Sequence, residues 1–199
     1  FILFTAALAL STVGANPVTE ADRDGNTATL EVVAELAQGP GNITVTPDGQ
    51  VPVSLHQFYN HDIRVARFGD NAQLTPFAAA ANVNSVLGLQ ADANGVVWLL
   101  DNAMRNGAVR RLVGWQASED RLVADIDLSS VTTDTAFLND LAVDPGRNTV
   151  YIADPAGNTD AAIIVVDTAS GVARRVLEGH KDDLGHRDDQ KDEQKHTEQ

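Results

Sequence analysis

A motif that occurs twice, about fifty residues apart, constrains the fold of this chain more than any other feature. The first copy is residues 91–101 (ADANGVVWLLD) and the second is residues 142–154 (AVDPGRNTVYIAD). Each copy has a turn rich in Asp, Asn and Gly, then an apolar run with one aromatic residue (Trp98 or Tyr151), then an Asp. A fainter copy covers residues 45–55. A repeat of roughly 45–53 residues built from short strands and turns is typical of β-propeller blades.

Short alternating or apolar runs separated by turn signals predict the strands of each repeat. In the second unit we expect strands at 86–91, 96–101, 108–115 and 122–128, and in the third at 141–144, 149–154, 162–167 and 173–177. Upstream we expect strands at 30–36, 42–46, 51–59 and 62–68, followed by a loop over 70–82. The sequence therefore predicts an all-β fold, a β-propeller with about three four-stranded blades.

The flanks of the repeats differ from them in composition. Residues 1–15 begin with an apolar run (FILFTAALAL) that is too short to span a membrane and is typical of the remnant of a signal peptide. A buried N-terminal strand is the alternative. Residues 16–29 are polar and predict a linker, residues 30–180 a partial propeller, and residues 181–199 a disordered charged tail. We therefore expect a secreted protein, extracellular or periplasmic.

The charge and the absence of cysteine exclude several classes of function. The chain has 199 residues and a formal net charge of -14, so contact with nucleic acid or with an anionic membrane surface would be repulsive. The same charge is compatible with a cationic small ligand or a divalent metal, but the simpler interpretation, which we favour, is the solubility of an acidic protein. With no cysteine, the chain has no disulfide, no thiolate zinc site and no cysteine nucleophile.

Four segments, taken in order, carry a resemblance to a known family. They are residues 95–101 (GVVWLLD), 137–144 (FLNDLAVD), 150–154 (VYIAD) and 164–167 (IVVD). The chain resembles the major royal jelly protein and Yellow family, particularly its bacterial members, which is related in fold to the gluconolactonase and regucalcin group. The resemblance implies a six-bladed, usually secreted propeller. About three blades would then be the N-terminal half of an incomplete ring.

Asn139 and Asp140 are the main candidates for a functional site, because they precede a strand that would line the central channel. A carboxylate and an amide oxygen there would suit a hard cation such as calcium. Resemblance to the lactonase group implies that Asn139 is a metal ligand, with Asn84 at the analogous position of the preceding blade. The cofactor would be a divalent cation, calcium or zinc. The alternative is that Asn139 and Asp140 only cap a turn.

A polar loop after the Trp98 strand holds two further candidates for ligand binding, Asn102 and Arg105. The guanidinium of Arg105 offers a fork of donors to a carboxylate or a lactone carbonyl. The alternative is a solvated Arg105, with Asp101 and Asp154 capping the turns that follow their strands. No Gly-x-Ser-x-Gly elbow, P-loop or His-Glu-x-x-His motif is present.

Three functions remain open at this stage, and whether the chain is an enzyme is one of the questions. The first is a secreted propeller that binds a small molecule in its central channel, with Asp140, Asn102 and Arg105 as contacts. The second is a metal-dependent lactonase, in which a cation polarises the lactone carbonyl and activates water. The third is an inactive fragment. Half a propeller would also expose apolar blade faces, so we expect self-association through them.

Overall fold

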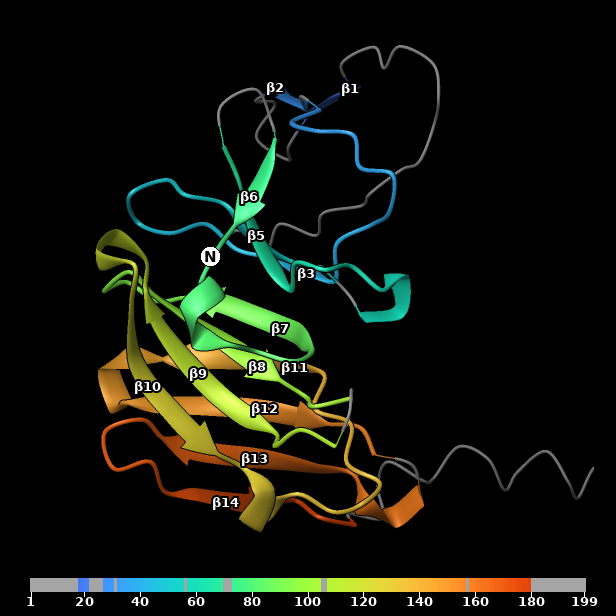
Figure 1. Ribbon diagram of the computed structural model, residues 1–199, viewed down its shortest axis with the longest axis vertical. Coiled ribbons are helices and arrows are strands. Elements are labelled where there is room, and N and C mark those ends of the chain that lie inside the picture. Colours follow the sequence, from blue (N-terminus) through green and yellow to red (C-terminus); the bar gives the residue numbers. More distant parts are fainter. Residues whose placement is uncertain are drawn as a thin grey trace, which may run out of the picture.

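The computed structural model describes residues 18–21, 27–30, 32–55, 57–69, 73–104, 107–156 and 158–179. These residues form three four-stranded antiparallel sheets and one two-stranded hairpin, connected by short 3-10 turns. The sheets lie one after another along the longest axis, in the order of the sequence (Figure 1). The expected all-β architecture of about three propeller blades in an open ring is confirmed for this part of the chain.

Each sheet is a simple meander of four consecutive strands, as in a propeller blade. The first blade is β3 (Asn42–Ile43), β4 (Pro52–Ser54), β5 (Val65–Phe68) and β6 (Leu74–Pro76). The second is β7 (Val86–Ala91), β8 (Val96–Asp101), β9 (Arg111–Gln116) and β10 (Arg121–Asp127). The third is β11 (Asp140–Asp144), β12 (Thr149–Asp154), β13 (Ala162–Asp167) and β14 (Ala173–Val176).

The repeated turn motif closes the hairpin between the first two strands of each blade. In the second blade, Asp92 Oδ1 accepts hydrogen bonds from the backbone N–H groups of Asn94 (2.8 Å) and Val96 (3.0 Å), and its Oδ2 accepts one from the Trp98 indole (3.1 Å). Gly95 supplies the positive φ of 78° that this turn needs. Thr46 and Asp144 close the corresponding turns of the other two blades with their side-chain oxygens.

Apolar side chains between the sheets hold the blades together. One buried cluster joins the first and second blades around Trp115 and Leu99, and another joins the second and third around Leu100 and Ile152. The middle strands of the second blade are therefore buried on both faces. In β12 and β13 of the third blade the buried residues alternate instead, and Tyr151 on the outward face is 39% exposed. Its aromatic counterpart Trp98 is only 7% exposed.

The first strands of the blades, β3, β7 and β11, form the inner side of the assembly. β7 packs against both β3 and β11. Ser54 Oγ donates to the Leu87 carbonyl (2.7 Å) between the first and second blades, and the Val143 N–H donates to Gln90 Oε1 (3.0 Å) between the second and third. In a propeller this inner side faces the central axis.

The predicted strands of the second and third blades agree with the structure, whereas those of the first need correction. Residues 32–36 form no strand, because Val32 and Val33 have no neighbouring strand and are exposed. The strand expected over 51–59 is β4 alone, followed by a 3-10 turn at Gln57–Tyr59. The expected loop over 70–82 contains β6 and a 3-10 turn at Ala79–Ala81, whose Ala81 is buried.

The flanking segments are described only in part. Within the predicted linker, β1 (Val18–Ala21) pairs antiparallel with β2 (Thr27–Leu30). The predicted signal-peptide remnant, residues 1–15, and the predicted tail, residues 181–199, lie outside the described residues. Among the residues described, no helix has the length and apolar character to cross a membrane.

Candidate functional site

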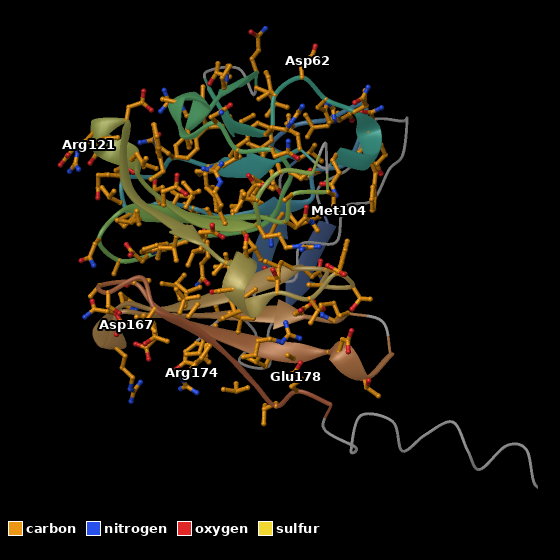
Figure 2. The ribbon with its side chains drawn as sticks, turned by 60° about the horizontal axis from the view of Figure 1, so that its bottom comes forward. Asp62, Met104, Arg121, Asp167, Arg174 and Glu178 are labelled. Carbon is orange, nitrogen blue, oxygen red and sulfur yellow. The ribbon has the colours of Figure 1, made fainter. Side chains whose placement is uncertain are left out.

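The candidate residues gather at one end of the blades. The turns that follow β7, β9, β11 and β13 lie at what we call the turn end, and Arg121 and Asp167 mark it in Figure 2. The opposite end, which we call the loop end, carries the longer connections, including the loop of Met104 after β8 (Figure 2). The starts of the inner strands β3, β7 and β11 face this loop end.

At the loop end, Asn42 of the first blade and Asp140 of the third blade meet. Asn42 Nδ2 donates to Asp140 Oδ1 at 3.1 Å, across 98 positions of sequence. Asp140 Oδ1 also accepts from the Leu141 N–H (2.8 Å), while Asn42 Oδ1 accepts from the Ile43 N–H (2.7 Å). The carboxylate of Asp140 is therefore oriented by two donors and stays exposed to solvent.

Gly88 of the second blade completes this contact. Asn42, Gly88 and Asp140 each lie four residues before the residue that closes the turn of their own blade (Thr46, Asp92 and Asp144), so they occupy equivalent positions. A Cβ atom at Gly88 would lie 2.9 Å from Asp140 Cα and 3.0 Å from Asp140 Oδ1. Only glycine therefore allows β11 to lie this close to β7.

Two buried aspartates fix the backbone of the loop end. Asp101, with no exposed side-chain surface, accepts from the N–H groups of Asn84 (2.7 Å) and Ser85 (2.9 Å) and pairs with Arg111 (3.4 Å). Asp154 does the same in the third blade, where it accepts from the Phe137 N–H (2.8 Å) and pairs with Arg175 (2.8 Å). Asp101 also caps the turn after β8, since its Oδ1 accepts from the Ala103 N–H (3.1 Å). Among the described residues, Asp154 instead holds the connection before β11 and the Arg175 side chain of β14.

These contacts correct the proposed equivalence of Asn84 and Asn139. The N–H of Asn84 is held by Asp101 as that of Phe137 is held by Asp154, so Asn84 corresponds to Phe137. The residue opposite Asp101 is Val86, and by the register of β11 with β12 the residue opposite Asp154 is Asn139. Asn84 lies eight residues before Asp92, whereas Asn139 lies five before Asp144, and the register of β7 with β8 shifts between Val86 and Leu89.

Asn139 lies at the loop end beside Asp140 and is exposed, with its N–H donated to the Ala153 carbonyl (3.1 Å). Calcium takes about six to eight oxygen ligands. No group of three or more His, Cys, Asp or Glu side chains suited to a metal ion occurs in the part of the chain that the structure describes. Metal ligation by Asn139 and Asn84 thus stays a prediction, and no catalytic step is assigned to it.

The other predicted contacts have different surroundings. Asn102 is 2% exposed, and its Oδ1 accepts from the Met104 N–H (3.3 Å), so its side chain braces the loop from within. Its Nδ2 is buried and has no hydrogen-bond partner among the described residues. Arg105 lies outside the described residues. Of the predicted ligand contacts that the structure describes, Asp140 is exposed to solvent and Asn102 is buried.

Several carboxylates that stabilise turns have clear pKa shifts, at the turn end for Asp144 and Asp167 and at the end of β10 for Asp127. A side-chain hydrogen bond from Arg147 holds the pKa of Asp144 below its ordinary value. The backbone N–H and hydroxyl of Ser170 lower the pKa of Asp167. These carboxylates stabilise turns and stay ionised, as structural groups do.

The second and third blades match the model of a known protein family. The family model described as "Major royal jelly protein" matches residues 84–197, more than half of the chain, including the whole second and third blades. The chain belongs to the major royal jelly protein family. The resemblance carried by the four sequence segments is thereby confirmed. No curated protein matches the chain.

Two solved propeller structures illustrate what this chain is similar to. One is described as "YCF48 bound to D1 peptide", with 11% identity and a TM-score of 0.48, covering 76% of this chain and 44% of that one. The other is a gluconolactonase from Xanthomonas campestris, with 16% identity and a TM-score of 0.48, covering 80% of this chain and 54% of that one. The chain spans about half the length of each.

Sequence reasoning missed Asn42 and Gly88 as neighbours of Asp140. The sequence does contain a signal for this contact. Each of the three residues lies four positions before the residue that closes the turn of its own blade. Aligning the copies on their turns, instead of on their aromatic residues, would have placed the three side by side on the inner strands.

Proposed function

We propose that this chain binds a cationic small molecule at the loop end of the propeller axis, with Asp140 as the anionic contact. The meeting of Asn42 and Asp140 beside Gly88 carries the proposal, since it joins the inner strands of all three described blades at one point. Small-molecule sites in β-barrels lie preferentially at the mouth, where strand ends meet.

The chemistry of Asp140 supports a positively charged ligand. Its Oδ1 is held by Asn42 and Leu141, whereas its Oδ2 accepts no hydrogen bond from the described residues. An ammonium group would pair with that free oxygen by a charge-assisted hydrogen bond. The net charge of -14 would raise the local concentration of cations around the molecule.

Calorimetric titration with phenethylamine, a small apolar ammonium, tests the proposal. We expect saturable binding to the wild type and at least about tenfold weaker binding to D140N, because a charge-assisted hydrogen bond is worth about 1.5–3 kcal/mol. The amide oxygen of the variant still accepts from Asn42 and Leu141, so the local structure is kept. D134N removes the same charge from an exposed turn residue and should bind like the wild type.

Two results would contradict this function. One is equal affinity of the wild type and D140N for phenethylamine. The other is the absence of amine binding together with a rise in melting temperature on adding calcium or zinc that Asn139→Ala abolishes. The second result would support the metal-dependent lactonase instead.

A further inference from the structure

A hollow of about 470 Å³ lies between the first and second blades. This volume is in the range of small-molecule sites, about 300–1,000 Å³. It lies farther from the axis than Asp140, because its walls come from the entries to the third strands, β5 and β9, and from the connection before β7. Its polar walls are Arg64, Asn82, Asn84 and Arg111, and its apolar walls include Val83 and Val109.

The two arginines of this hollow differ in how far they are neutralised. Arg111 pairs with Asp125 (2.9 Å) and Asp101 (3.4 Å). Arg64 donates from Nη1 to the His61 carbonyl, and none of the acidic side chains that the structure describes forms an ion pair with it. A guanidinium has five N–H donors, so Arg64 keeps donors and a full positive charge.

The walls around Arg64 are held in place by the backbone. The Arg64 carbonyl accepts from the Leu55 N–H (2.9 Å), which fixes the entry to β5. Across the hollow, Arg111 Nη2 donates to the Asn82 carbonyl (3.0 Å), and Asp101 holds the Asn84 N–H. Fixed walls lower the ordering cost of binding a ligand.

We propose that this hollow binds a small organic carboxylate. The Arg64 guanidinium would hold the carboxylate through paired N–H donors, a geometry that arginine supplies and lysine does not. The apolar body of the ligand would lie against Val83 and Val109, of which Val109 is 45% exposed. The site is thus a second one, opposite in charge to that of Asp140, and does not depend on the proposed amine binding.

Calorimetric titration with phenylacetate tests this site, with phenylacetamide as the uncharged analogue. We expect saturable binding of phenylacetate to the wild type, at least about tenfold weaker binding to R64Q, and similarly weaker binding of phenylacetamide to the wild type. R121Q removes an equal charge from an exposed residue at the turn end, paired with Glu119, and should bind phenylacetate normally. D140N should also bind it normally, which separates this site from the amine site.

Amide chemical shifts of the wild type provide a readout that does not depend on the folding of a variant. Titration with phenylacetate should shift the backbone signals of Asn82, Asn84 and Val109 and leave those of the turn end unchanged. Equal affinity of the wild type and a folded R64Q would overturn the proposal. So would shifts confined to other residues, or no saturable binding of phenylacetate.

Discussion

Replacement of Gly88 by alanine should destabilise the protein and disturb Asp140 at the same time. The added Cβ would lie 2.9 Å from Asp140 Cα, 3.0 Å from Asp140 Oδ1 and 3.1 Å from the Asn139 carbonyl oxygen. Favourable contacts between carbon atoms lie at about 3.5–4.0 Å, so β11 would have to move by about 0.6 Å. The nearest obstacle is backbone, which cannot rotate away as the end of a side chain would.

The size of the effect follows from two opposing contributions. Overpacking of this kind costs about 1–3 kcal/mol. Alanine in a strand gains about 0.5–1 kcal/mol over glycine, because the unfolded chain loses less freedom on folding. The net loss in the free energy of unfolding should be about 1–2 kcal/mol. Because β11 carries Asp140, phenethylamine binding should weaken as well.

Urea unfolding followed by tryptophan fluorescence measures the loss. With a slope of about 2 kcal/mol per molar, the midpoint of Gly88→Ala should fall by roughly 0.5–1 M. Gly69→Ala is the matched control, since a Cβ there would meet no atom of the described residues nearer than 3.6 Å and the residue has no positive φ. It should be neutral or slightly stabilising. A midpoint for Gly88→Ala equal to that of Gly69→Ala would refute the close approach of β7 and β11.

Three further predictions concern other parts of the fold. Asp154→Ala should lower the free energy of unfolding by about 3 kcal/mol, because it removes the buried carboxylate partner of Arg175 and leaves that side chain, among the described residues, only the exposed Glu178 at 3.4 Å as an ion-pair partner; urea unfolding measures this. Since Ser170 lowers the pKa of Asp167, the stability from this contact is present above the unfolded pKa and is lost as pH falls below about 4. Urea midpoints at about pH 5 and about pH 3 should therefore differ less in Asp167→Asn. We also propose self-association through the outward face of the third blade, which Tyr151→Arg should reduce in sedimentation velocity.

Exposed and surface variants serve as controls for the buried pair, the Asp167 contact and self-association. Asp134→Ala, at an exposed turn residue, should leave the urea midpoint unchanged, and an equal loss in both aspartate variants would contradict the buried-pair explanation. An acid sensitivity in Asp167→Asn as large as in the wild type would show that other groups dominate below pH 4. A wild type that sediments as a monomer at every concentration would rule out self-association.

The strands of the second and third blades could be predicted from the sequence, because local chemistry decides them. Asp92 and Asp144 close turns with their own side chains, and the runs after them are too apolar to remain exposed. The first blade was harder, since β6 has only three residues, includes Pro76 and pairs with β5 at three positions. Short strands of this kind depend on their neighbours more than on their own sequence.

The candidate site was predictable only in part. Asp140 was found because it starts a strand, but its contact with Asn42 arises from the packing of three blades. The hollow beside Arg64 left no local signal, because its walls come from three separate connections. The register shift in β7 also left no signal in the repeat pattern, and in the structure Val86, not Asn84, lies opposite Asp101.

The position of a bound amine tests the central claim most directly. A crystal structure of the chain with phenethylamine should place the ammonium nitrogen within hydrogen-bond distance, about 2.7–3.2 Å, of the Asp140 carboxylate. The aromatic ring should extend along the inner strands near Asn42 and Gly88. An amine bound elsewhere, with Asp140 free of contact, would contradict the claim that the loop end of the axis is the binding site.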